Sequence, residues 1–213
     1  PIGMMREYVA LLRECLSGEP VTFEGDYFNA KRFRLGVRLG ERKPKIIMAA
    51  LNPQMLKLAG EVADGVLLNY LPASHVGTSI EQVRKGGNAK IYAYVHAAVG
   101  DFERSAKSAR KDLFNYAMAD GYARMFSQAG FADEIKELRA RQAEKDREGA
   151  LAAVSDRMIQ AIDFIGNKSE VTNFVKDYVK AGVEHPVLMP LPWGEDRRAI
   201  TDATISAAIK AVT

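Results

Sequence analysis

The segment from 45 to 69 reads KIIMAALNPQMLKLAGEVADGVLLN, and it decides the fold class. Residues 46–50 are apolar and include two β-branched isoleucines, which predicts a buried strand. An amphipathic helix follows and starts at Pro53, because proline is favoured at the first helical position. That helix ends before Gly65, and residues 66–69 predict a second buried strand. Strand, helix and strand at this spacing indicate a βαβ unit with parallel strands.

The same pattern continues along the chain, so we predict an α/β protein with a parallel sheet. Further strands are expected at 91–99 and 183–190, a hairpin at 21–28, and helices at 4–17, 74–85, 102–128, 133–148, 155–165, 169–182 and 198–212. Residues 29–44 predict a surface connection, with a role in holding an anionic ligand as the alternative. The cations of this connection are Lys31, Arg32, Arg34, Arg38, Arg42 and Lys43.

Composition excludes several classes of protein. The chain has 213 residues, of which 47% are hydrophobic and 27% charged, as in ordinary globular proteins. No apolar run approaches the roughly 18 residues that a bilayer requires, so we predict no membrane segment. The formal net charge of +3 is too small to favour nucleic acid as a partner. A single cysteine, Cys15, excludes an internal disulfide, and we expect a reducing, cytoplasmic setting.

Candidate site residues follow from the rule that parallel α/β folds bind ligands at the carboxyl ends of their strands. Asn52 stands at the start of a helix, where it could help bind a phosphate or could simply cap the helix. The amide of Asn69 could bind a ring or a ribityl chain, or could satisfy a buried turn. Tyr70 and Trp193 are candidate walls of an apolar substrate pocket, with plain packing as the alternative.

The familiar catalytic motifs are missing from the sequence, which contains no GxGxxG, GxxxxGK[ST], GxSxG or HExxH. The histidines His75, His96 and His185 stand far apart, so we predict no metal site and expect each to be structural. No acid–base pair can be identified, and the catalytic residues stay unknown. Such a sequence is typical of a protein in which a bound organic cofactor supplies the chemistry.

The run from Ile46 to Asn69 closely resembles the luciferase-like monooxygenase superfamily, in particular the branch of oxidoreductases that use the deazaflavin coenzyme F420. Other segments agree with this resemblance. They are residues 6–9 and 17–25, Tyr122–Phe126, and residues 181–190. The resemblance implies a TIM-type (β/α)8 barrel, of which this chain holds only the C-terminal four β/α units. It also implies one partial domain over residues 1–213, with a helical insertion at about 102–165.

The resemblance further implies which residues bind the cofactor. The loop after the fifth barrel strand and the turn after the sixth contact the flavin-type ring, the ribityl chain and the phosphate in this family. The matching residues here are Ala49, Ala50, Leu51, Asn52, Leu68 and Asn69. Many relatives have glycine where Asn52 stands, and asparagine tolerates a left-handed conformation there.

The expected function is hydride transfer between F420 and a small organic substrate. An FMN-dependent luciferase-like monooxygenase is the alternative within the family. A non-catalytic truncated barrel, kept for flavin binding or association, is the alternative of another class. Half a barrel exposes two strand edges and its inner face. Because the chain also begins at Pro1, we expect a missing N-terminal half or a second copy in a homo-oligomer, such as a dimer, and no activity from this chain alone.

Overall fold

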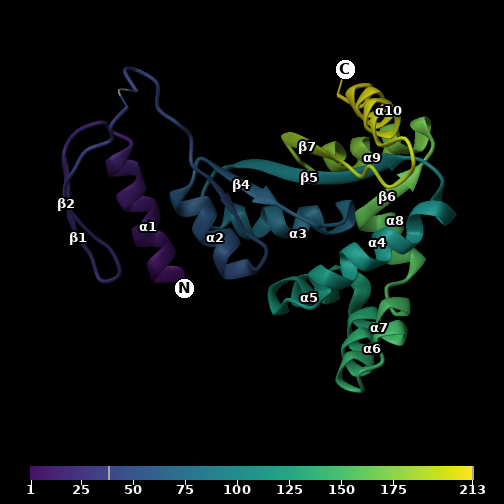
Figure 1. The fold of residues 1–213 in the computed structure, drawn as a ribbon. Coiled ribbons are helices and arrows are strands. Elements are labelled where there is room, and N and C mark those ends of the chain that lie inside the picture. The colour runs from purple at the N-terminus through teal and green to yellow at the C-terminus, as the bar shows by residue number, and fades with distance from the viewer. Residues whose placement is uncertain (38, 213) are drawn as a thin grey trace.

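The computed structural model describes residues 1–37 and 39–212. Arg38, one of the cations predicted on the connection at 29–44, lies outside the described residues. The strands are β1 (Val21–Glu24), β2 (Asn29–Phe33), β3 (Ile47–Ala49), β4 (Gly65–Leu68), β5 (Lys90–Val99), β6 (Asp163–Gly166) and β7 (His185–Pro190). The helices are α1 (Ile2–Cys15), α2 (Pro53–Val62), α3 (Ala73–Arg84), α4 (Phe102–Ala117), α5 (Asp120–Phe126), α6 (Ala132–Ala143), α7 (Arg147–Ala152), α8 (Asp156–Ile162), α9 (Lys168–Lys180) and α10 (Arg197–Ile209), with a π-helical segment η1 (Ser127–Phe131). Figure 1 shows α1 and the β1–β2 hairpin at one end, the parallel strands in the middle, and α4 to α8 at the other end.

Within the described residues, five parallel strands form one sheet around β5. Ala93 is in register with both Leu68 of β4 and Pro186 of β7. Ala97 is likewise in register with residues of both β6 and β7. A residue can face two strands only when they lie on opposite edges, so β4 and β6 share one edge of β5, and β7 takes the other.

The two faces of this sheet differ in burial because successive side chains alternate between them. On the outer face Val66, Ile91 and Val95 are fully buried, and α9 and α10 contact β5. On the inner face Ile47 keeps 44% and Met189 keeps 41% of its surface exposed. The strands therefore form part of a barrel whose inner surface is partly open, as the sequence analysis expected.

The strand β6 does not follow from the sequence pattern, which predicts one helix over 155–165 and a turn after it. The structure ends α8 at Ile162, and Asp163–Gly166 pair in parallel with β5. Met158, Ile159 and Ile165 fit a helical period, but periodicity cannot show that a neighbouring strand offers hydrogen bonds. The sheet therefore has five strands where four were predicted.

The helices of the insertion between β5 and β6 are interrupted more often than predicted. The helix expected at 102–128 stops at Ala117 and restarts at Asp120 as α5. Gly130 has φ 99°, a left-handed conformation that suits glycine, and it lies in the π-helical segment. The helix α9 begins with a capping box at Asn167, slightly before the start predicted at 169.

The connection predicted at 29–44 begins with a strand, because β2 pairs with β1 in an antiparallel hairpin. The carboxylate of Glu7 in α1 holds the turn of this hairpin. It accepts hydrogen bonds from the backbone N–H groups of Asp26, Tyr27 and Phe28 at 2.9, 2.9 and 2.6 Å. A Cβ at position 25 would lie 2.1 Å from Oε1 of Glu7, so the close approach requires Gly25.

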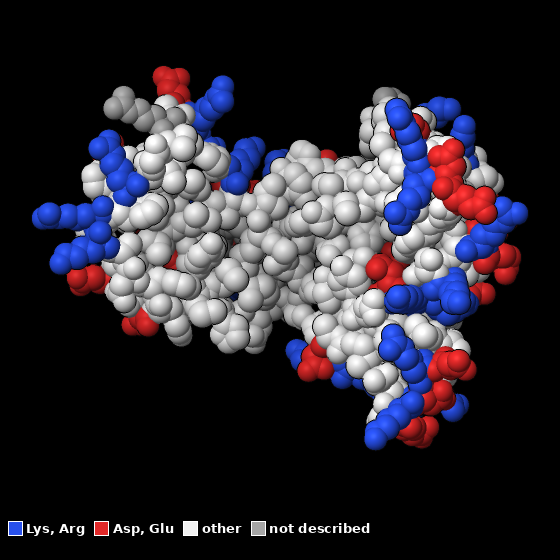
Figure 2. Space-filling view, viewed as in Figure 1, with Lys and Arg blue, Asp and Glu red and all other residues white. Residues whose placement is uncertain are grey.

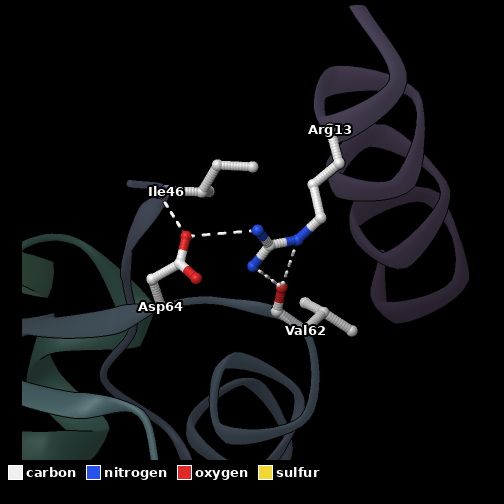
Figure 3. Close-up of polar contacts among 4 residues, drawn as sticks. All are labelled: Arg13, Ile46, Val62 and Asp64. Atoms are coloured by element: carbon white, nitrogen blue, oxygen red, sulfur yellow. Dashed lines mark hydrogen bonds and ion pairs between the residues drawn. The ribbon is translucent and has the colours of Figure 1, made fainter. Parts of the chain in front are cut away.

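An arginine joins α1 to the parallel strands (Figure 3). The guanidinium of Arg13 donates to the carbonyl oxygen of Val62 at 2.8 and 3.3 Å and to Oδ2 of Asp64 at 3.2 Å. The same carboxylate oxygen accepts the backbone N–H of Ile46 at 2.8 Å. Burial raises the pKa of Asp64, but the Ile46 N–H and Arg13 lower it more, so the carboxylate stays charged at neutral pH. Asp64 thus fixes the start of β3 and the position of α1 together.

Charged side chains are distributed unevenly over the face shown in Figure 2. They gather at its two ends, over the hairpin with α1 and over the helices of the insertion and α10, while the middle is largely uncharged.

Among the helices of the described residues, none combines the length and apolar character needed to cross a bilayer.

Candidate functional site

A pocket of about 550 Å³ lies at the carboxyl ends of β3 and β4. Its lining residues are Pro1, Ile2, Ala49, Ala50, Leu51, Asn52, Gln54, Met55, Leu67, Asn69, Tyr94, Tyr122 and Arg124. Five of the six residues predicted to bind the cofactor are in this lining. The exception is Leu68, which points to the outer face and is 1% exposed, so its neighbour Leu67 lines the pocket instead.

Asn52 is the residue before α2, but its side chain does not cap that helix. Its Nδ2 donates to the carbonyl oxygen of Gly121 in α5, at 3.5 Å. Its Oδ1 is buried and has no partner within the described residues. The interpretation of Asn52 as a simple cap is therefore wrong, and its amide instead links the end of β3 to the insertion.

Asn69 makes a matching contact from the end of β4. Its Nδ2 donates to the hydroxyl oxygen of Tyr122 at 3.0 Å, and its Oδ1 is also buried without a partner among the described residues. Burial raises the pKa of Tyr122, although the bond from Asn69 lowers it in part. The Tyr122 hydroxyl therefore stays protonated and keeps a proton that it can donate.

These two unpartnered oxygens leave the pocket with two unsatisfied hydrogen-bond acceptors. A buried acceptor left unpaired costs about 1–3 kcal/mol, and here two belong to residues that line the same pocket. A ligand that carries hydroxyl or N–H groups would supply the missing donors. The volume lies in the range of about 300–1,000 Å³ typical of small-molecule sites.

Tyr70, predicted as a pocket wall, packs behind the pocket and does not line it. Its hydroxyl donates to Oδ2 of Asp112 in α4 at 2.7 Å, and its ring lies 3.8 Å from Tyr116 and 4.0 Å from His96, centroid to centroid. Burial, assisted by Asp112, raises the pKa of Tyr70 far above the usual range. Its φ of 51° is left-handed, which costs about 1–3 kcal/mol for a residue other than glycine. These contacts hold the strained turn directly after Asn69.

A buried histidine–aspartate pair lies next to Tyr70. Nδ1 of His96 is 3.2 Å from Oδ1 of Asp163, and the side chains are only 4% and 0% exposed. Burial raises the pKa of Asp163 to about 6, even though His96 lowers it. The residues are far apart in sequence, and Asp163 belongs to the strand that the sequence analysis missed. No group of three or more metal-ligating side chains forms in the part of the chain that the structure describes.

Trp193 also lies outside this pocket. It is partly buried against the core, and its carbonyl oxygen accepts a hydrogen bond from Oγ of Ser105 at 3.1 Å. The aromatic side chains that line the pocket are Tyr94 and Tyr122. Sequence patterns place Tyr122 and Arg124 only in the insertion, because no local signal shows that α5 reaches the strand ends.

The fold and the pocket together define a class: a parallel α/β barrel segment with a cofactor-sized pocket, lined by polar side chains and one arginine, at the carboxyl ends of its strands. Comparison with known proteins agrees. The chain belongs to the luciferase-like monooxygenase family, whose family model matches residues 1–185.

Two curated relatives are 5,10-methylenetetrahydromethanopterin reductases. The protein from Archaeoglobus fulgidus is 26% identical over 211 residues, which cover 93% of this chain and 63% of the relative. The protein from Methanopyrus kandleri is 27% identical over 208 residues, which cover 92% and 59%. The chain thus spans about six-tenths of the length of these relatives.

Two solved structures share the fold. The coenzyme F420-dependent tetrahydromethanopterin reductase of Methanopyrus kandleri gives a TM-score of 0.76 at 23% identity, covering 100% of this chain and 63% of that chain. An F420-dependent secondary alcohol dehydrogenase, solved with an F420–acetone adduct, gives 0.64 at 19% identity, covering 88% and 55%. The predicted fold class, a luciferase-like (β/α)8 barrel present in part, is confirmed.

Proposed function

We propose that this chain forms part of the F420 site of an oxidoreductase, which transfers a hydride between the deazaflavin and a small organic substrate. The observation that carries the proposal is the pocket at the ends of β3 and β4, where Asn52 and Asn69 each hold a buried, unpartnered amide oxygen. The relatives support the cofactor, since both solved structures of similar fold are of F420-dependent enzymes.

The residues present fit such a cofactor. A deazaflavin carries a ring N–H and ribityl hydroxyls, which are the donors that the two amide oxygens lack. The Tyr122 hydroxyl can donate to a ring or ribityl oxygen in return. Ala49 and Ala50 are small, so they leave room for a flat ring. When bound, the cofactor supplies the hydride chemistry; the residues of this chain bind it, orient it and exclude water.

The substrate is proposed only as a chemical class. The relatives are named for methylenetetrahydromethanopterin and for secondary alcohols, so we propose a small organic substrate. Roles of Tyr70 and Trp193 in a substrate pocket stay predictions, as does the description of residues 1–213 as one partial domain. That a second copy or further barrel strands cover the open inner face also stays a prediction.

The proposal is tested by titrating the protein with F420 and, separately, with FMN, following absorbance and heat of binding. We expect F420 to bind, and Asn69→Ala to weaken that binding about fivefold or more through loss of a polar contact. The matched control is Asn173→Ala, an exposed asparagine on α9.

Tight FMN binding without affinity for F420 would overturn the choice of cofactor and favour the monooxygenase alternative. A protein that binds neither would favour the non-catalytic alternative in which the truncated barrel is kept for association.

A further inference from the structure

We propose that Arg124 binds the phosphate of the cofactor and so gives this pocket its preference for phosphorylated over neutral deazaflavins. This inference rests on the proposed function and adds a residue that determines specificity. It starts from one feature of the lining: Arg124 is the only charged side chain among the described residues that line the pocket.

No described residue neutralises the charge of Arg124. Within the described residues, no carboxylate lies within ion-pair distance of its guanidinium. The nearest acid on the same helix, Asp120, stands four residues earlier and is paired with Arg139 at 2.7 Å. An exposed guanidinium at a pocket can bind an anion without first breaking an ion pair, because its neighbouring acid, Asp120, is already paired with Arg139.

The position of Arg124 relative to the pocket is fixed by its own helix. Gly121 and Tyr122, on the same short helix α5, accept the hydrogen bonds from Asn52 and Asn69. These two contacts attach α5 to the ends of β3 and β4, the strands whose ends form the pocket. Arg124 is therefore held beside the pocket by the residues that orient its two amides.

The start of α2 lies at the same pocket and favours the same kind of ligand. Gln54 and Met55, in the first turn of this ten-residue helix, belong to the lining, and that turn contains no acidic residue. Free N–H groups at a helix start favour an anion. Together with a guanidinium, which matches a phosphate with paired N–H donors, they form an anion site of two independent parts.

The test compares ligands with and without the phosphate. Affinities are measured for F420, for the deazaflavin riboside and for the riboside 5′-phosphate, which differs from the riboside only in the phosphate. Each is titrated into wild type, Arg124→Gln and Arg124→Lys, and the 5′-phosphate should respond to Arg124→Gln as F420 does. We expect Arg124→Gln to weaken F420 binding about tenfold and to change binding of the neutral riboside less than twofold. Arg124→Lys keeps the charge but not the paired donors, so it should lose less affinity than Arg124→Gln. Added salt should weaken F420 binding to wild type more than to Arg124→Gln.

Arg104→Gln is the matched control, an exposed arginine of α4 outside the pocket. Equal losses for both ligands, or no loss for F420, would overturn the role of Arg124 while the proposed function stands. If wild type binds FMN and not F420, the proposed cofactor fails, and the same comparison between FMN and riboflavin decides the role of Arg124. A protein that binds none of these ligands overturns both.

Discussion

The side-chain amide of Asn69 donates a hydrogen bond to the hydroxyl of Tyr122, 3.0 Å away. This contact joins the end of β4 to α5, across 53 positions of sequence. A second contact, from Asn52 to Gly121, joins the end of β3 to the same helix. The insertion is therefore a wall of the candidate site and sets the direction in which both amides point.

Replacing Tyr122 by phenylalanine should keep the ring and remove only the partner of Asn69. The amide would then be free to rotate, and we expect F420 binding to weaken about fivefold, from the loss of roughly 1 kcal/mol. Binding is measured by titration, and Tyr27→Phe, an exposed tyrosine of the hairpin, is the control. Unchanged affinity would show that the Asn69–Tyr122 contact does not shape the site.

Asn52→Asp should also weaken cofactor binding. The aspartate would bring a negative charge toward the phosphate of the ligand and would remove the N–H that reaches Gly121. Affinity for F420 should fall at least tenfold, while Asn173→Asp on α9 should have no effect. An Asn52→Asp variant that binds as tightly as wild type removes Asn52 from the site.

Tyr70→Phe should lower the free energy of unfolding by about 1–3 kcal/mol, because it removes a hydrogen bond to a carboxylate and leaves a strained turn less well held. Urea unfolding measures this change. A loss no larger than that of Tyr27→Phe would mean that the bond to Asp112 contributes little to holding the turn.

Asp163 should make stability depend on pH in a defined direction. Its pKa rises to about 6 in the folded chain from an ordinary value of 3.8, so the folded state binds its proton more tightly. The resulting stabilisation is complete below about pH 4 and is lost as the pH rises through 6. Asp163→Asn removes this contribution.

The difference in unfolding free energy between wild type and Asp163→Asn should therefore decline from pH 4 to pH 6, as followed by urea unfolding at several pH values. Asp202→Asn, at an exposed position of α10, should show no such trend. A flat difference for Asp163→Asn would contradict the raised pKa.

Glu7→Gln should loosen the hairpin and leave the rest of the fold unchanged. Burial raises the pKa of Glu7, but the three backbone N–H groups lower it further, so the folded hairpin favours the carboxylate. The neutral amide is a weaker acceptor. Hydrogen exchange at residues 26–28 should become faster in the variant, while exchange in β5 stays slow; equal protection at 26–28 in both proteins would contradict the role of Glu7.

The sequence by itself determined the α/β class, the parallel strands at β3, β4, β5 and β7, and the resemblance to the luciferase-like family. These features depend on local patterns, such as apolar runs bounded by Asn52-Pro53 and Asp64-Gly65, which act over a few residues. Most of the predicted cofactor residues follow from the same patterns, because a strand end is a local feature.

Only the tertiary structure decided what surrounds those strand ends. It placed α5 against Asn52 and Asn69, turned Leu68 away from the pocket, and brought His96 to Asp163 through a strand with a helix-like pattern. Each of these contacts joins residues far apart in sequence. Their energy depends on the packing of the insertion against the sheet, and this packing cannot be predicted from local sequence periodicity.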